Sequence, residues 1–212
     1  RDILMDAIID KKKIPLSLLG ELNETDLTNA SDTDLQDALE RDGYLFLRNI
    51  INPKEIEIAR NDIFKRLKDV NELKEPYEDG IASGDSSRDK IHNDRGHFWE
   101  KVSLSKPLRE VTNGKNLENI FSKIFGTPST GFDFIFLRAV AGGKFTHMHC
   151  DAGFFTRLTQ KILTCWLVFT EITLDKGPLF VIEGSHKFKA IQEKYIGFDV
   201  NIDKDKKATI DT

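Results

Sequence analysis

The stretch Ile162-Leu-Thr-Cys-Trp-Leu-Val-Phe-Thr-Glu-Ile172 is rich in β-branched and aromatic residues and contains neither glycine nor proline. Such a run is typical of a β-strand. The turn signal Asp175-Lys-Gly-Pro178 follows it, and a second apolar run occupies residues 178–182. Two earlier segments, 132–140 and 144–150, have the same character and are separated by Gly142-Gly143. We therefore predict several strands in this half of the chain.

Upstream of these segments the sequence carries helix signals. Ser31-Asp-Thr-Asp34 supplies capping side chains for a helix that runs to Arg41 and ends at Gly43, and residues 44–48 then read as a strand. Asn52-Pro53 opens a second helix to about Val70. A third helix is predicted from about residue 107 to 125. Helices followed by strands predict an α+β fold with an antiparallel sheet or barrel.

Two regions of the sequence have no clear helix or strand pattern. Residues 1–30 hold a short apolar segment around residues 3–9 and then a polar stretch, so we predict a peripheral helix and a linker. Residues 73–97 read as a long irregular excursion, and loops of this length are usually functional lids or solvated insertions. Trp99 lies just beyond this excursion. The sequence does not choose between a lid over a site and a solvated insertion.

The composition is that of an ordinary globular protein. With 39% hydrophobic and 31% charged residues among 212, we expect a single domain. A net charge of −4 gives no reason to expect a nucleic-acid partner, so a small-molecule ligand is favoured. No apolar run approaches the roughly 20 residues of a membrane span, and two cysteines are too few for a disulfide scaffold, so we expect a cytoplasmic protein. Both ends look cut, and the oligomeric state is left open.

The triplet His149-Cys-Asp151 is the central chemical feature. On a strand, residues separated by one position project from the same face, so the imidazole and the carboxylate can converge on one ion. With a second histidine, these two side chains form a facial triad that leaves three positions open on Fe(II). A buried, hydrogen-bonded His–Asp pair is the structural alternative. A second copy, His92-Asn-Asp94, lies in the polar excursion, where a solvated or substrate-facing loop is the better interpretation.

Several ordered motifs resemble the phytanoyl-CoA dioxygenase family of Fe(II)/2-oxoglutarate-dependent oxygenases. They are Met148-His-Cys-Asp151, Trp166 and Gly177-Pro-Leu-Phe-Val-Ile-Glu-Gly-Ser-His186, with a looser match at Glu40-Arg-Asp-Gly-Tyr44. Glu183 departs from the proline that the family commonly has before Gly-Ser-His. The resemblance covers about residues 35–190. It implies a double-stranded β-helix, a jelly-roll or cupin-like barrel, flanked by amino-terminal helices.

The resemblance also implies residue roles. His149 and Asp151 are expected to be the catalytic metal ligands for Fe(II), and Trp166 to contact the cosubstrate 2-oxoglutarate. Lys101 and Phe136 match looser cosubstrate positions. Structural alternatives remain open for these three: a core aromatic, a solvated lysine and a core phenylalanine. Residues near the substrate are expected to be Phe154, Phe155, Arg157 and Trp99. His186 is interpreted as shaping a turn rather than as a ligand.

The implied function is a dioxygenase that uses O2 to hydroxylate a small-molecule or acyl substrate and releases succinate and CO2. The distal histidine ligand and the arginine that pairs with 2-oxoglutarate are expected beyond Thr212, so this piece alone is expected to be inactive. Two alternatives stay open. One is a jelly-roll binding protein or pseudoenzyme without a complete triad, and the other is a cupin-like metalloprotein that uses His147 and His149.

Overall fold

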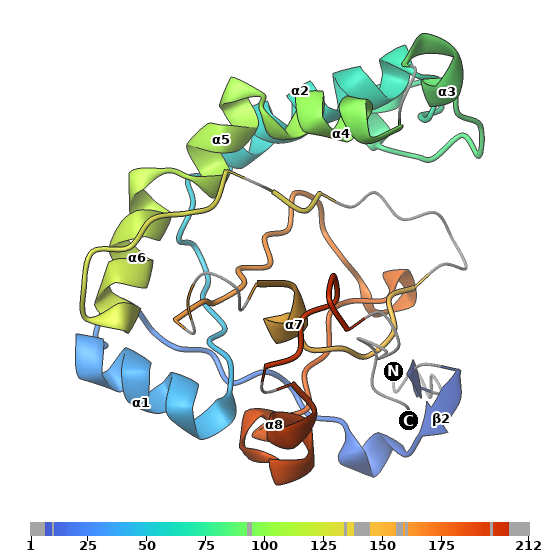
Figure 1. Ribbon diagram of the computed structural model, residues 1–212. Coiled ribbons are helices and arrows are strands. Elements are labelled where there is room, and N and C mark those ends of the chain that lie inside the picture. Colours follow the sequence, from blue (N-terminus) through green and yellow to red (C-terminus); the bar gives the residue numbers. More distant parts are fainter. Residues whose placement is uncertain are drawn as a thin grey trace. The chain divides into compact units, whose positions relative to one another are not determined.

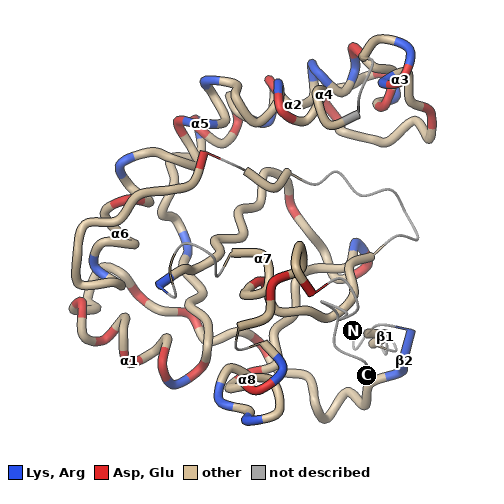
Figure 2. The backbone as a smooth tube through the Cα atoms, in the orientation of Figure 1, with Lys and Arg blue, Asp and Glu red and all other residues tan. Residues whose placement is uncertain are grey.

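A computed structural model describes residues 7–9, 11–92, 95–133, 135–137, 145–155, 159, 161–195 and 197–203 (Figure 1). The chain divides into two compact units, which are considered separately. Unit 1 comprises Arg1–Phe46, Lys144–Trp166 and Leu179–Thr212, and unit 2 comprises Leu47–Gly143 and Leu167–Pro178. Figure 2 shows Lys and Arg interspersed with Asp and Glu along the described helices. Within the described residues, no helix combines the length and apolar character needed to cross a bilayer.

Unit 2 is built on helices packed around one apolar core. Its helices are α2 (Pro53–Asp69), α3 (Arg88–Ile91), α4 (Arg95–Ser103), α5 (Lys106–Thr112) and α6 (Lys115–Phe125), with the 3-10 turns η2 (Tyr77–Asp79) and η3 (Leu174–Lys176). The buried core cluster is Ile63, Leu67, Val70, Phe98, Val102 and Leu108. Burial of each such side chain contributes about 1.5–3 kcal/mol. This core holds α2, α4 and α5 together (Figure 1).

Unit 1 contains α1 (Asp32–Asp42), a small hairpin and several short helical turns. The strands are β1 (Ala7–Ile9) and β2 (Lys12–Ile14), and the remaining elements are η1 (Leu16–Leu18), α7 (Ala152–Phe155), η4 (Ser185–Lys187) and α8 (Lys189–Tyr195). A contact distant in sequence joins η4 to the end of α1. His186 Nε2 donates to the carbonyl oxygen of Glu40 at 2.9 Å, and the Gly184 N–H donates to the carbonyl of Asp42 at 2.9 Å.

The predicted helix boundaries are confirmed for α1 and α2. Ser31 and Asp34 form a capping box at the start of α1, and Gly43 ends that helix with φ 83°. Asn52 accepts a hydrogen bond from the Lys54 N–H at the start of α2, where Pro53 is the first residue. The predicted third helix ends at Gly126 as expected, but it is divided into α5 and α6 at Asn113 and Gly114.

The predicted β-rich half differs from the structure. Within the described residues, the sheet consists of the antiparallel strands β1 and β2, in which Ala7 pairs with Ile14. Segments 162–172 and 178–182 have no ladder there, and the predicted strand at 44–48 is reduced to one parallel bridge between Phe46 and Glu24. A strand needs a partner distant in sequence, whereas a helix satisfies its own hydrogen bonds. Leu179, Phe180, Val181 and Ile182 remain 36–48% exposed.

The amino-terminal region also differs from its prediction. Residues 7–9 and 12–14 form the paired strands β1 and β2 where a peripheral helix was predicted, while residues 1–6 and 10 lie outside the described part. Lys11 has φ 69°, a left-handed conformation that suits a tight two-residue turn between paired strands. The β-branched Ile8 and Ile9 favour a strand at this position. Local turn geometry therefore outweighs the weak helical pattern.

The excursion after α2 is closed at its base by hydrogen bonds. The Ser87 N–H donates to the Val70 carbonyl at 2.7 Å, and Ser83 Oγ donates to the Asn71 carbonyl at 2.6 Å. Arg88 pairs with Glu72 and stacks over the rings of Phe98 and Trp99 at 4.5 and 4.2 Å. Residues 71–91 thus form a segment with joined ends that contains η2 and α3, where an irregular excursion was predicted. Whether the 73–97 segment acts as a lid stays a prediction, and residues 93–94 lie outside the described part.

Candidate functional site

The two predicted ligands lie close together in unit 1. His149 Nε2 is 3.3 Å from Asp151 Oδ1, and the side chains are 35% and 39% exposed. The segment then turns into the short helix α7, and the Phe154 N–H donates to the Asp151 carbonyl at 2.9 Å. His149 lies in an isolated β-bridge, and Asp151 lies in the turn that leads into α7. The prediction placed them on one face of a strand.

A backbone contact defines the tautomer of His149. Its Nδ1 is 2.7 Å from the carbonyl oxygen of His147, and a carbonyl can only accept, so Nδ1 carries the hydrogen. In the neutral imidazole, Nε2 then carries the lone pair, and it faces the Asp151 carboxylate. Two electron-rich atoms at 3.3 Å are stabilised by a cation that both can bind, or by a proton on Nε2. An imidazole that donates its second N–H to a carbonyl is the usual arrangement of a metal-bound histidine.

This pair fits two positions of an Fe(II) triad. A facial triad needs two histidines and one carboxylate, and His149 and Asp151 supply one of each. Within the part of the chain that is described, no group of three or more His, Cys, Asp or Glu side chains is placed to hold an ion. His186 binds the Glu40 carbonyl, as expected for a turn-shaping residue. The ring of His147 lies edge-on to Phe145, with ring centroids 4.9 Å apart.

Cys150, between the two predicted ligands, remains a thiol at neutral pH. Burial and then the nearby Asp151 charge raise the pKa of Cys150 from its ordinary value of 9.0. Burial also raises the pKa of Cys165. Both cysteines are free.

The other predicted site residues are distributed over both units. Trp166, in unit 1, is 52% exposed, and Phe154 is 46% exposed, with its ring centroid 6.4 Å from that of Phe155. Phe136 (66% exposed) and the exposed Lys101 of α4 belong to unit 2. Their contacts with cosubstrate or substrate stay predictions. Arg157 lies outside the described residues.

Trp99 has a structural environment in unit 2. It packs against the core cluster, and the Arg88 guanidinium covers its ring. These contacts are a sufficient structural reason for an aromatic residue at position 99, even if Trp99 does not contact a substrate. Its predicted substrate contact stays a prediction.

Two aromatic residues behind the ligand segment were missed by sequence reasoning. Tyr195 and Phe198 are 5% and 2% exposed, and they contact the segment through Cys150 and Gly153. The available signal was a pair of aromatic residues three positions apart around Gly197 at the end of an amphipathic segment. Nothing local indicated which part of the chain they would cover.

Comparisons with known proteins agree with the motifs. A family model described as Phytanoyl-CoA dioxygenase (PhyH) matches residues 39–210, which is most of the chain. Two relatives, from Caenorhabditis elegans and Caenorhabditis briggsae, are each named phytanoyl-CoA dioxygenase domain-containing protein 1 homolog. Each is 26% identical over 190 residues, covering 73% of this chain and 65% of the relative.

The chain thus spans slightly less than two thirds of the length of these relatives. No solved structure matches significantly. The family model matches well over half of the sequence and includes the His149–Asp151 segment. The chain belongs to the phytanoyl-CoA dioxygenase family.

Proposed function

We propose that this protein is an Fe(II)/2-oxoglutarate-dependent dioxygenase that hydroxylates a small-molecule or acyl substrate. The observation that carries the proposal is the His149–Asp151 pair, with Nε2 and Oδ1 3.3 Å apart and the imidazole tautomer set by the His147 carbonyl. Membership of the family supports it. A reducing compartment such as the cytoplasm is consistent with two free cysteines.

His149 and Asp151 would hold the iron, and when bound it would supply O2 activation coupled to conversion of 2-oxoglutarate into succinate and CO2. The His147 carbonyl keeps the Nδ1 proton of His149 in place, so Nε2 stays available. Phe154 and Phe155 lie three and four residues after Asp151 and would give the substrate side an apolar character. Trp166, Lys101 and Phe136 are proposed to contact the cosubstrate.

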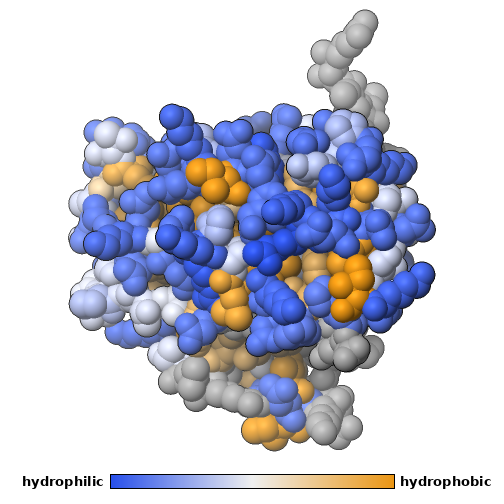
Figure 3. Space-filling view, turned by 90° about the horizontal axis from the view of Figure 1, so that it is seen from above, coloured by the Kyte–Doolittle hydropathy of each residue, from blue (hydrophilic) through white to orange (hydrophobic). Residues whose placement is uncertain are grey.

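The proposed fold of the catalytic domain is a double-stranded β-helix. Family membership supports it, as do the consecutive half-exposed apolar side chains at residues 179–182. Figure 3 shows hydrophobic patches that interrupt a mainly hydrophilic surface. A run of consecutive apolar residues is typical of a strand that is covered on both faces.

Binding of Fe(II) and 2-oxoglutarate tests the function. Calorimetry under anaerobic conditions would compare the full-length protein with its Asp151→Ala variant. An Asp37→Ala variant is a matched control, because Asp37 is an exposed carboxylate on α1 of the same unit. We expect iron-dependent 2-oxoglutarate binding that Asp151→Ala abolishes and Asp37→Ala retains. Succinate release in the presence of O2 would then report turnover.

A non-catalytic binding protein is the second candidate, because no third metal ligand adjoins the pair in the described residues. Failure of the full-length protein to bind Fe(II) would contradict the oxygenase and favour this candidate. A cupin-like site would instead lose metal on His147→Ala. The same calorimetric measurement therefore separates the three functions.

A further inference from the structure

Phe198 packs directly on the backbone that follows the ligand pair. Gly153 is buried, and a Cβ atom placed on it would lie 2.4 Å from Phe198 Cδ1. Any side chain at residue 153 would therefore displace the ring. Since Gly153 is two residues after Asp151, the ring restricts where the Asp151 backbone can lie.

Two hydrogen bonds fasten the same segment. The Val200 N–H donates to the Gly153 carbonyl at 3.1 Å, on one side of Asp151. On the other side, the Cys150 N–H donates to the Tyr195 hydroxyl. The segment from Cys150 to Gly153 is thus held at both ends by Tyr195, at the end of α8, and by Phe198 and Val200 beyond it.

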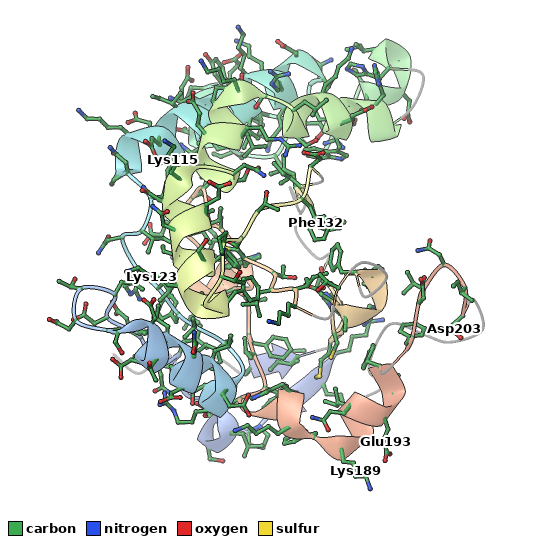
Figure 4. The ribbon with its side chains drawn as sticks, turned by 60° about the vertical axis from the view of Figure 1, so that its left-hand side comes forward. Lys115, Lys123, Phe132, Lys189, Glu193 and Asp203 are labelled. Carbon is green, nitrogen blue, oxygen red and sulfur yellow. The ribbon has the colours of Figure 1, made fainter. Side chains whose placement is uncertain are left out.

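The two aromatic side chains also brace each other. The rings of Tyr195 and Phe198 meet edge to face, with centroids 5.8 Å apart and planes at 71°. Lys189 and Glu193 form an exposed ion pair at 3.6 Å and point away from the body of α8 (Figure 4). The end of α8 that carries Tyr195 is therefore its buried part, whereas its start faces solvent.

We propose that Tyr195 and Phe198 are positioning residues for the metal-binding side chains of His149 and Asp151, and that they act through the backbone at Cys150 and Gly153. This inference rests on the proposed function. A ligand pair with 35% and 39% exposed side chains has little packing of its own to hold it. Fixing the backbone on both sides of Asp151 would keep Nε2 and Oδ1 converging before metal binds, and supporting contacts of this kind typically change metal affinity about 10–100-fold.

The test uses Co(II) as a spectroscopic probe of the full-length protein. Tyr195→Phe removes the hydroxyl that accepts from Cys150 and leaves the ring in place. Tyr44→Phe is the matched control, because the Tyr44 hydroxyl accepts from the Asn23 N–H at 2.9 Å in the same unit. We expect Tyr195→Phe to weaken Co(II) binding about tenfold and to shift the visible Co(II) absorption. Tyr44→Phe should change neither, even if both variants lose similar thermal stability.

Phe198→Leu provides a second variant that retains apolar volume, and it too should weaken Co(II) binding. If Phe198→Leu fails to fold, Tyr195→Phe still decides. Co(II) binding that depends on Asp151 but has the same affinity and spectrum in Tyr195→Phe would overturn this inference and leave the proposed function standing. No Asp151-dependent binding of Fe(II) or Co(II) by the unchanged protein would overturn the proposed function, and this inference with it.

Discussion

His186 Nε2 lies 2.9 Å from the carbonyl oxygen of Glu40, although 146 positions separate the two residues. Glu40 is in the last turn of α1, where carbonyl groups have no partner within the helix. The imidazole donates to one of these carbonyls, and the Gly184 N–H donates to that of Asp42. The Gly184-Ser-His186 turn therefore caps the end of α1. This contact gives a physical reason why the motif at residues 40–44 and the motif at residues 184–186 occur together.

Gly43→Ala should destabilise unit 1. Gly43 has φ 83°, and a Cβ there would lie 2.3 Å from His186 Nδ1, so strain and collision act together. We expect a loss of about 2–4 kcal/mol in the free energy of unfolding, measured by urea denaturation. Gly177→Ala is the control for strain alone, because Gly177 has φ 71° and no atom within 4 Å of its Cβ position. Equal losses in both variants would refute the close packing of His186 on Gly43.

His186→Ala separates the structural role of this residue from a ligand role. Loss of the hydrogen bond to Glu40 and of the packing on Gly43 should lower stability by about 1–3 kcal/mol. Metal affinity should stay at the level of the unchanged protein, since Nε2 is already bound to a carbonyl. Calorimetric titration with Fe(II) checks this. A loss of binding comparable to that of Asp151→Ala would show that His186 is a ligand.

Arg88→Lys should loosen the loop that follows α2. The Arg88 and Glu72 side chains are 14% and 18% exposed, and the guanidinium also stacks on Phe98 and Trp99. Lysine retains the charge but loses the planar contacts, so we expect about 1–3 kcal/mol lower stability. Limited proteolysis should then cleave within residues 73–91 faster. Lys90→Ala, at an exposed position of α3, should leave cleavage unchanged.

Acid should weaken the end of α1 through Asp42. The hydrogen bonds from Arg41, at 2.7 Å, hold the pKa of Asp42 below its ordinary value of 3.8. The folded form therefore binds its proton less readily than the unfolded form does. The stabilisation is complete above the unfolded pKa and disappears as the pH falls through the lower folded pKa. Denaturation curves from about pH 6 to pH 3 should show a smaller pH dependence for Asp42→Asn; an unchanged slope would contradict the assignment.

Features with local causes could be predicted from the sequence. Ser31 and Gly43 fix the ends of α1, and Asn52-Pro53 fixes the start of α2, because caps depend on residues within one turn of the helix. The division between α5 and α6 was missed because Gly114 is only a weak local signal inside an otherwise helical pattern.

Features that need distant partners could not be predicted equally well. The predicted strand at residues 44–48 depends on pairing that the structure provides only at Phe46. The spacing of His149 and Asp151 correctly brought the two side chains together, although His149 lies in an isolated β-bridge and Asp151 in a turn rather than both on one strand. The support from Tyr195 and Phe198 involves contacts about 45 residues apart, for which the local sequence gives no signal.

The discontinuity of unit 1 sets an order of folding during synthesis. Core residues of unit 2 from Ile63 to Leu108 are close in sequence, so this core can form soon after they leave the ribosome. Unit 1 must wait for Leu179–Thr212, because His186 and Phe198 complete the packing on α1 and on α7. Until then the His149–Asp151 segment lacks its contacts with Tyr195 and Phe198. We expect metal-binding competence to arise late, after the helical core of unit 2 has folded.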